Sequence, residues 1–300
     1  MADITADMIK DLRIKTGAGL LDCKKALSES GGNVDAAVEI LRKSGAAKAD
    51  KKTGRITAEG RVSLQVEGNQ AVMVEVNSET DFVAKNPEFQ SFADEVASTV
   101  LKTKSADLPA LLKAPFRGVT VEEALKNMIG KIGENISVRR FKTVQAAADE
   151  VLGSYIHMGN KIGVLVKLKG PKDKISEAVT RDVAMHVAAS APQYLQREDI
   201  PSEIIAKEKE IYLEQMKDSG KPANVLEKII EGKVSKFADE VCLVNQIFVK
   251  DPSGKQTVSQ FLKQIDPAIS VVDFVRYQVG EGLAKKEQDF ASEVAKAAQS

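Results

Sequence analysis

The sequence predicts an α+β protein: an N-terminal three-helix bundle, a duplicated α+β core with small antiparallel sheets, an inserted antiparallel helical hairpin and a C-terminal helix. Three observations support this prediction. Apolar residues at helical spacing fill residues 3–44. A pattern of strand, strand, helix, helix, strand then occurs twice. The second copy is the longer one, because the offset between matching residues grows from 91 to 137 within it.

Composition excludes several functional classes. The 300 residues include 43 basic and 43 acidic side chains, so the chain has no net field to attract nucleic acid or a lipid surface. Aromatic residues make up 5% and tryptophan is absent, which leaves few platforms for base stacking. Cys23 and Cys242 lack metal-ligand spacing and suit a reducing compartment as buried thiols. No run is long and apolar enough for a membrane span, and the N-terminal residues lack signal-peptide features. We expect a cytoplasmic protein without direct nucleic-acid or membrane partners.

Residues 1–44 are expected to form the three-helix head. Thr5 can cap the first helix and Asn33 the third, since short polar side chains accept the free N–H groups of a first helical turn. Glycine-containing turns separate the helices, and connections this short make neighbouring helices pack together. A core of this size is marginal on its own. Leu20 and Leu21 follow the first glycine turn directly, and one of the two is expected to be exposed.

A linker and two core copies follow the head. Residues 45–58 are small, polar and basic, which favours a solvated tether over a nucleic-acid-binding arm. Residues 59–143 form core copy one and residues 144–282 form core copy two. Each copy begins with a hairpin, and the pairs Gly68-Asn69 and Gly159-Asn160 predict tight primed turns.

The extra length of the second copy falls at about residues 201–241. Two charged helical stretches joined by a turn with glycine and proline predict an antiparallel hairpin there. Its arms carry more apolar side chains than two helices can hide from water, so we expect this surface to meet a partner or a second copy of the chain. Residues 283–300 are expected to form the C-terminal helical module, with Phe290 and Val294 as its apolar positions.

The stretch from residue 77 to residue 86 is the most informative for function. Ser78 with an acid three residues later predicts a helix start, and the Asn86-Pro87 pair ends that helix after one turn. This turn, between a strand and a longer helix, carries Asp81 and Phe82. A lone phenylalanine more often packs into the core. The alternative is an interface anchor that enters another molecule, because an acid and an aromatic ring on a rigid protrusion suit that role.

The sequence lacks the residue patterns of catalysis. His186 lies in a helical stretch and is expected to be a satisfied, half-buried residue. His157 lies at a strand end, where it is better placed for contact. No Ser or Cys motif accompanies either histidine, and no His/Cys cluster suits zinc. Residues 254–257 lack the spacing of a phosphate loop. We therefore expect a non-catalytic protein without a metal ion or cofactor.

Several stretches resemble the bacterial translation elongation factor Ts family, over essentially the whole chain and in the family's order. The most specific are the segments around the first glycine turn and around Phe82. One departure is Met158, an extra residue beside the family's pattern of tyrosine, histidine and glycine. The matching segments are Arg13 with residues 16–19, then 22–27, 80–85, 131–135, 162–166, 184–189 and 279–282.

The resemblance implies a guanine nucleotide exchange factor for elongation factor Tu that acts by binding and not by catalysis. It implies that the head is ubiquitin-associated-like and docks on the partner's nucleotide domain, that the hairpin supports a homodimer, and that the C-terminal helix touches the partner again. The implied wedge for GDP release comprises Thr80, Asp81, Phe82 and Val83, whose acid and aromatic ring disturb the partner's magnesium site. Further partner contacts are implied at Leu20, Leu21, Ile132, Gly133 and His157.

An enzyme is the weakest alternative, because the sequence contains no catalytic constellation, and two other classes stay open. One is a scaffold or assembly protein that uses the helical hairpin without exchange activity. The other is an RNA-binding module that uses the lysines of the linker, although the zero net charge counts against it. A nucleotide-release assay on elongation factor Tu separates the scaffold from the exchange factor.

Overall fold

The computed structural model describes residues 4–217, 219 and 222–283, except for the side chain of Met158. The chain forms two compact units. The first unit contains the described residues up to Gln65, then Val74–Phe141 and the residues from Gln278 onward, and the second contains Val66–Met73 and Lys142–Tyr277. Beyond Leu283, the expected C-terminal module at residues 283–300 lies outside the described residues.

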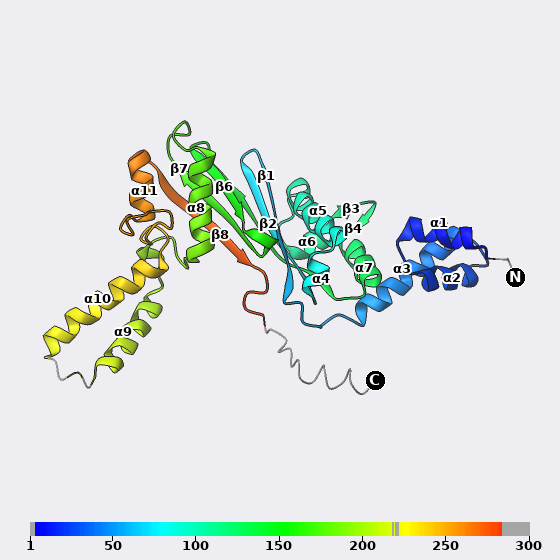
Figure 1. Ribbon diagram of the computed structural model, residues 1–300, viewed down its shortest axis with the longest axis horizontal. Coiled ribbons are helices and arrows are strands. Elements are labelled where there is room, and N and C mark those ends of the chain that lie inside the picture. The colour runs from blue at the N-terminus through cyan, green and yellow to red at the C-terminus, as the bar shows by residue number, and fades with distance from the viewer. Residues whose placement is uncertain (1–3, 218, 220–221, 284–300) are drawn as a thin grey trace. The chain divides into compact units, whose positions relative to one another are not determined.

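Three helices form the head. They are α1 (Ala6–Thr16), α2 (Leu20–Glu29) and α3 (Val34–Asp50) (Figure 1). Both predicted caps are confirmed. The Thr5 hydroxyl accepts the Met8 N–H at 3.3 Å, and the Asn33 side-chain carbonyl accepts the Ala36 N–H at 3.0 Å. The buried side chains of the bundle are Leu12, Cys23, Ala26, Leu27 and Ala37.

The linker is shorter than predicted because α3 continues to Asp50. Residues 45–50, assigned to the tether from their small side chains, are helical and pack against α7 (Val121–Ile132). A Cβ atom added to Gly130 of α7 would lie 2.9 Å from the Gly45 Cα, so two glycines permit the close approach of these helices. The same small residues that resemble a tether therefore serve helix packing.

The first core copy has the predicted order of strand, strand, helix, helix, strand. Its strands β1, β2 and β5 form one sheet in the order β1-β2-β5. The helix α6 and the two-residue antiparallel ribbon of β3 and β4 were not predicted. The elements besides α7 are β1 (Glu59–Glu67), β2 (Gln70–Ser78), α4 (Asp81–Ala84), α5 (Pro87–Thr103), α6 (Leu108–Lys113), β3 (Pro115–Phe116), β4 (Val119–Thr120) and β5 (Ile136–Gln145).

The second core copy repeats this order. Strands β6 and β7 pair antiparallel, and the sheet order is β6-β7-β8. Helix α8 lies along β6 and β7 (Figure 1). This close packing needs Gly153, because a Cβ there would lie 2.3 Å from the Thr180 Cβ on α8. The elements are β6 (Glu150–Ile156), β7 (Ile162–Lys169), α8 (Glu177–Ser190), α11 (Val258–Ile265) and β8 (Ser270–Gln278).

The two hairpin turns differ, although both were predicted to be tight. In copy one, Gly68-Asn69 alone connects β1 to β2, as predicted. In copy two, residues 157–161 connect β6 to β7 and include the short 3-10 helix η1 (Met158–Asn160). Gly159 and Asn160 still have positive φ angles of 78° and 56°, but the additional residues lengthen the loop.

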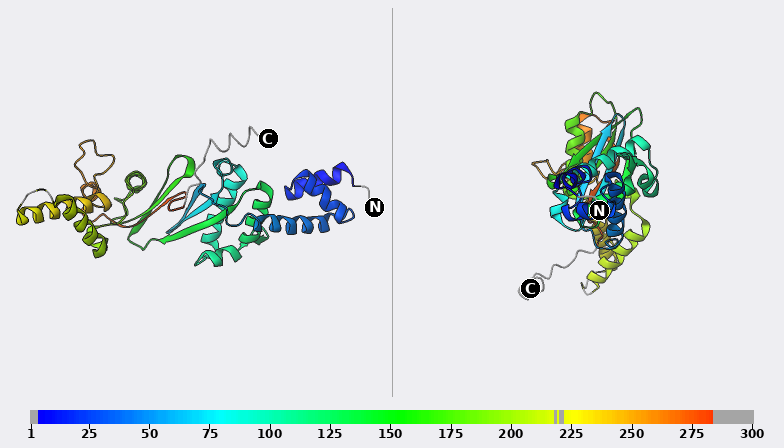
Figure 2. Two further views of the ribbon diagram at one scale, coloured as in Figure 1. Left: turned by 90° about the horizontal axis from the view of Figure 1, so that it is seen from below. Right: turned by 90° about the vertical axis from the view of Figure 1, so that its right-hand side faces the viewer.

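The inserted segment forms α9 (Ser202–Met216) and α10 (Ala223–Val241), which lie side by side (Figures 1 and 2). The insertion was predicted at about residues 201–241. None of the α9 residues is buried. The buried residues around the start of α9 and the end of α10 are Ile200, Ala238, Val241 and Cys242. Within the described part of the chain, no helix has the length and apolar character needed to cross a membrane.

Candidate partner interface

The finger, defined here as Glu79 to Lys85, carries the one-turn helix α4. Its Phe82 side chain is 80% exposed. The next two residues, Val83 and Ala84, are only 7% and 8% exposed and anchor the turn to the core. The expectation that a lone phenylalanine packs inside is therefore wrong here. An apolar ring of this size, held out from an anchored turn, is typical of an interface anchor.

The sequence pattern predicted Ser78 as the cap of α4, but the cap is Thr80. The Thr80 hydroxyl accepts the Val83 N–H at 3.4 Å. Ser78 is buried at the end of β2, and its hydroxyl donates to the Thr80 carbonyl oxygen at 2.9 Å. Because β2 continues through Ser78, the helix can begin only after the strand ends.

Asp81 forms an ion pair with Lys85, four residues later on the same turn. The Asp81 carboxylate accepts from the Lys85 ammonium group at 2.7 Å, and this contact raises the pKa of Lys85. Both side chains are substantially exposed to water, so the pair is weak and easily exchanged for another partner. The carboxylate thus lies on the finger beside Phe82, in a solvent-exposed ion pair.

The loop after α7 lies against the base of the finger. Gly133 ends α7 with a φ angle of 88°, and Gly133 is exposed while Ile132 is half-buried. The Glu134 carboxylate accepts the Thr80 N–H at 3.0 Å and the Thr80 hydroxyl at 2.8 Å. The structure therefore brings together two predicted contact segments, residues 80–83 and 132–133. Sequence reasoning missed Glu134, although it lies within the matched segment 131–135.

Leu20 and Leu21, at the start of α2, are 56% and 79% exposed. Only one of them was expected to be exposed. Ile14 of α1 is also largely exposed, which adds apolar surface to the head. Since the inward-facing positions of α2 are already filled by other side chains, nothing in the small core requires these leucines. The head therefore exposes three large apolar side chains to solvent.

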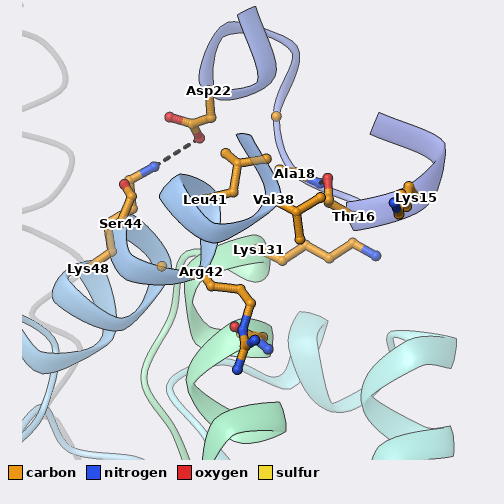
Figure 3. Close-up of a pocket in the computed structure, with 14 residues that line it drawn as sticks. Lys15, Thr16, Ala18, Asp22, Val38, Leu41, Arg42, Ser44, Lys48 and Lys131 are labelled. Carbon is orange, nitrogen blue, oxygen red and sulfur yellow. Dashed lines mark hydrogen bonds and ion pairs between the residues drawn. The ribbon is translucent and has the colours of Figure 1, made fainter. Parts of the chain in front are cut away.

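Lys131 of α7 connects the head to the first core copy. Figure 3 shows its side chain extending beneath the turn between α1 and α2, near Thr16 and Ala18. A Cβ atom on Gly17 would lie 2.5 Å from the Lys131 Nζ, so the glycine leaves room for this lysine. The Lys131 ammonium also donates to both oxygens of Glu88 at 2.7 Å, at the start of α5. A chain of contacts thus runs from the head turn to the helix that follows the finger.

His157 belongs to the second unit and is exposed. Its Nδ1 atom lies 3.1 Å from the Tyr155 hydroxyl, and the two rings are tilted at 46° with centroids 6.1 Å apart. The His157 N–H donates to the Ile162 carbonyl at 2.9 Å, which closes the hairpin behind the side chain. The ring is therefore presented to solvent at a hairpin end.

The other histidine is structural. His186 is fully buried in α8, where its Nδ1 accepts the Val249 N–H at 3.1 Å and its Nε2 hydrogen bonds with the Gln246 side-chain carbonyl at 3.0 Å. This confirms the expectation of a satisfied helix residue, but the expected half-burial is wrong, because the side chain is fully buried. Among residues 4–217, 219 and 222–283, no group of three or more His, Cys, Asp or Glu side chains could hold a metal ion.

Comparison with known proteins shows to which family the chain belongs. A sequence model of a family described as Elongation factor TS matches residues 79–281. Elongation factor Ts from Methylococcus capsulatus is 50% identical over 294 residues, which cover 97% of each chain. The chain belongs to the elongation factor Ts family. The family match begins at Glu79, the first residue of the finger, and the similarity to the Methylococcus elongation factor Ts extends it across the head. Membership of the elongation factor Ts family implies a nucleotide exchange factor of protein synthesis that acts on elongation factor Tu.

Proposed function

We propose that this chain promotes GDP release from elongation factor Tu by inserting Asp81 and Phe82 into the partner's nucleotide domain and disturbing its magnesium site. The observation that carries the proposal is the exposure of Phe82, 80%, on a turn whose next two residues are buried. An exposed ring on an anchored turn can enter a partner with little loss of conformational freedom.

The physical basis is thermodynamic linkage between the two ligands of the partner. A protein that prefers the nucleotide-free conformation lowers the partner's affinity for the nucleotide by a certain factor. The nucleotide lowers the partner's affinity for that protein by the same factor. Burial of Phe82 only when the partner's helices separate would contribute about 2 kcal/mol, or more than tenfold in affinity. No catalytic group is needed for this mechanism.

Asp81 adds charge to the same step. On insertion, its carboxylate would leave Lys85 and meet the water network of the magnesium ion. Since Mg²⁺ requires near-ideal octahedral geometry, a displaced ligand or water weakens its bond to the β-phosphate. The exposed Asp81–Lys85 pair is weak enough to be broken at this point.

The remaining contacts extend the interface. Exposed apolar side chains of the head, Leu20 and Leu21, would dock on the nucleotide domain, and the loop at Ile132 and Gly133 would bind beside the finger. His157 would contact the phosphate-loop side of the partner. The proposed place of action is the cytoplasm. The helical hairpin would support a homodimer. The proposed mechanism involves no nucleic acid, membrane, metal or cofactor of this chain.

Replacing Phe82 tests the wedge. Phe82→Ala is expected to slow stimulated release of a fluorescent GDP analogue from elongation factor Tu by about tenfold or more, because the lost burial is about 2 kcal/mol. The melting temperature of the Phe82→Ala variant should differ little from that of the wild type, since the ring is exposed.

The matched control is Phe89→Ala, which removes a fully buried ring from α5. This variant should lose about 3 to 5 kcal/mol of stability. If Phe82→Ala unfolds the protein as Phe89→Ala does, while activity per folded molecule survives, then Phe82 is a structural residue and the wedge is wrong.

The scaffold without exchange activity is supported by one observation, the exposed apolar side chains of the hairpin helices, among them Ile211, Leu213 and Val225. The same release assay separates the two functions. A scaffold would bind elongation factor Tu in a sedimentation experiment but leave the rate of nucleotide release unchanged.

A further inference from the structure

Two reciprocal hydrogen bonds join the base of the finger to the loop after α7. Glu134 accepts the Thr80 N–H at 3.0 Å, and Glu79 accepts the Asn135 N–H at 2.6 Å. Each glutamate therefore binds the backbone of the residue that follows the other glutamate. We call this arrangement of Glu79, Thr80, Glu134 and Asn135 the clasp.

Glu134 also determines how the cap of α4 is oriented. Its second oxygen accepts the Thr80 hydroxyl proton at 2.8 Å. Because that proton points to the carboxylate, the lone pairs of the hydroxyl are available to the Val83 N–H. Hydrogen bonds arranged in such a chain polarise and strengthen one another. Glu134 thus acts on the first turn of α4 through Thr80.

The finger needs such support because α4 is only four residues long. A single helical turn is not stable by its intrinsic propensity, since nucleation costs more than one turn of hydrogen bonds returns. Burial of Val83 and Ala84 fixes one side of the turn. Hydrogen bonds from Thr80 to a carboxylate are charge-assisted and directional, so they fix the angle at which Phe82 leaves the surface.

The other half of the clasp is itself held from several directions. The Gly133 N–H donates to the Ile129 carbonyl at 2.9 Å, and the Lys52 ammonium donates to the Gly133 carbonyl. The Asn135 side-chain amide donates to the Arg55 carbonyl at 2.9 Å. The loop that carries Glu134 is therefore fixed before any partner binds.

We propose that Glu134 is a positioning residue for Phe82, and that the clasp makes the finger and residues 132–133 one preformed binding surface. The consequence for exchange rests on the proposed function of the finger. Preformed surfaces bind more tightly because less conformational freedom is lost on association. Without Glu134 the ring would still be exposed but would sample several directions.

The first test concerns the free protein. Glu134→Ala should accelerate amide hydrogen exchange at Thr80 and Val83 by about tenfold or more, since the charge-assisted acceptor of the cap is removed. Fluorine NMR on a fluorinated Phe82 should show a shifted, broader signal. The control is Glu122→Ala, which removes an exposed glutamate of α7 that pairs with Lys126. Unchanged protection of Thr80 and an unchanged fluorine signal in Glu134→Ala would overturn the positioning role.

The second test is a double-mutant cycle in the nucleotide-release assay. Glu134→Ala alone should reduce the rate of stimulated release by about five- to tenfold. In the Phe82→Ala background the same change should reduce it by less than about twofold, because the effects of residues that act together are not additive. Glu134→Gln, which keeps one acceptor oxygen, should fall between. A loss of equal size in both backgrounds would contradict action through Phe82. If Phe82→Ala alone leaves release unchanged, the proposed wedge is wrong, and the measurements on the free protein still decide the role of Glu134.

Discussion

At the residue scale, Glu75 shows how the fold can bury a charge. It lies in the middle of β2 with no exposed surface. Its carboxylate accepts from Arg139 at 2.9 Å, from Arg140 at 2.6 Å and from the Gly280 N–H at 2.9 Å. Burial by itself raises the pKa of Glu75, but the Gly280 N–H and the two arginines outweigh it and hold that pKa below its usual value.

Glu75→Gln should therefore destabilise the protein in a pH-dependent way. At pH 7 the expected loss is about 3 kcal/mol, since two arginines lose their buried anionic partner. A carboxyl whose folded pKa is lowered stabilises the fold above its unfolded pKa, and this contribution is lost as the pH falls through the folded value. The stability difference between wild type and variant should be constant from pH 8 to about pH 5. The stability difference should then disappear as the pH falls below the ordinary glutamate pKa of 4.5.

Urea denaturation at a series of pH values measures this difference. Glu122→Gln, at an exposed ion pair on α7, is the control and should cost less than about 1 kcal/mol at every pH. A gap between wild type and Glu75→Gln that persists unchanged at low pH would show that the effect comes from shape and not from charge.

Glu75 also marks a limit of sequence reasoning. The alternation of valines along β2 is typical of a strand with one face in solvent. All eight residues from Ala71 to Ser78 are buried instead. The Asn77 side chain, two residues away, donates to the Glu75 carboxylate at 3.1 Å, but its charged partners and the Gly280 N–H lie 64, 65 and 205 residues away in the chain. Local patterns cannot reveal partners at such separations.

At the element scale, the sequence predicted helices and strands well where the signal was local. The caps at Thr5 and Asn33 each involve a hydrogen bond to a residue three positions later, and both are confirmed. The predictions that were wrong depended on distant contacts. The end of α3 is set by packing on α7, and the start of α4 is set by the length of β2 and by Glu134. For the same reason, the finger could be predicted from sequence but the residue that orients it could not.

His186 connects α8 to α10, because Gln246 binds its ring and donates to the carbonyls of Ser190 in α8 and Glu240 in α10. Since Nδ1 accepts a backbone N–H from Val249, the proton must be on Nε2 and the ring must be neutral. Burial lowers the pKa of His186, although the hydrogen bond to Gln246 opposes this. Protonation would break the bond to Val249.

The stability of the protein should therefore fall as the pH decreases from about 7.5 to 5.5, with a slope of at most 1.4 kcal/mol per pH unit from this residue. The sign follows from linkage: the unfolded chain binds a proton near the ordinary histidine pKa of 6.5, and the folded chain does not. His186→Gln should be less stable at pH 7.5 and should lack this slope.

Thermal or urea unfolding at the two pH values measures the slope, and His157→Gln is the control. The chain contains only two histidines, which makes the assignment direct. If the slope disappears in His157→Gln and persists in His186→Gln, the buried histidine is not its source.

At the scale of the whole molecule, the internal repeat was the most useful sequence signal. It predicted two strand–strand–helix–helix–strand copies and the insertion between the helices of the second. The repeat does not say what the inserted helices contact. The two helices pack on one another, yet Leu213 of α9 is 54% exposed, and Ile211 and Val225 are each 40% exposed. Apolar side chains left in water on a paired helix surface indicate a further contact.

We expect that contact to be a second copy of the chain, paired through α9 and α10. Leu213→Glu would place a charge in an apolar interface, at a cost of about 2 kcal/mol or more, so the dimer should weaken by more than tenfold. Analytical ultracentrifugation across a concentration series measures the shift. Gln264→Glu, which adds the same charge at an exposed position of α11, outside the hairpin, should leave the dimer intact. A wild-type chain that stays monomeric up to about 0.1 mM, a weak limit for specific association, would contradict the dimer and leave the hairpin surface for a different partner.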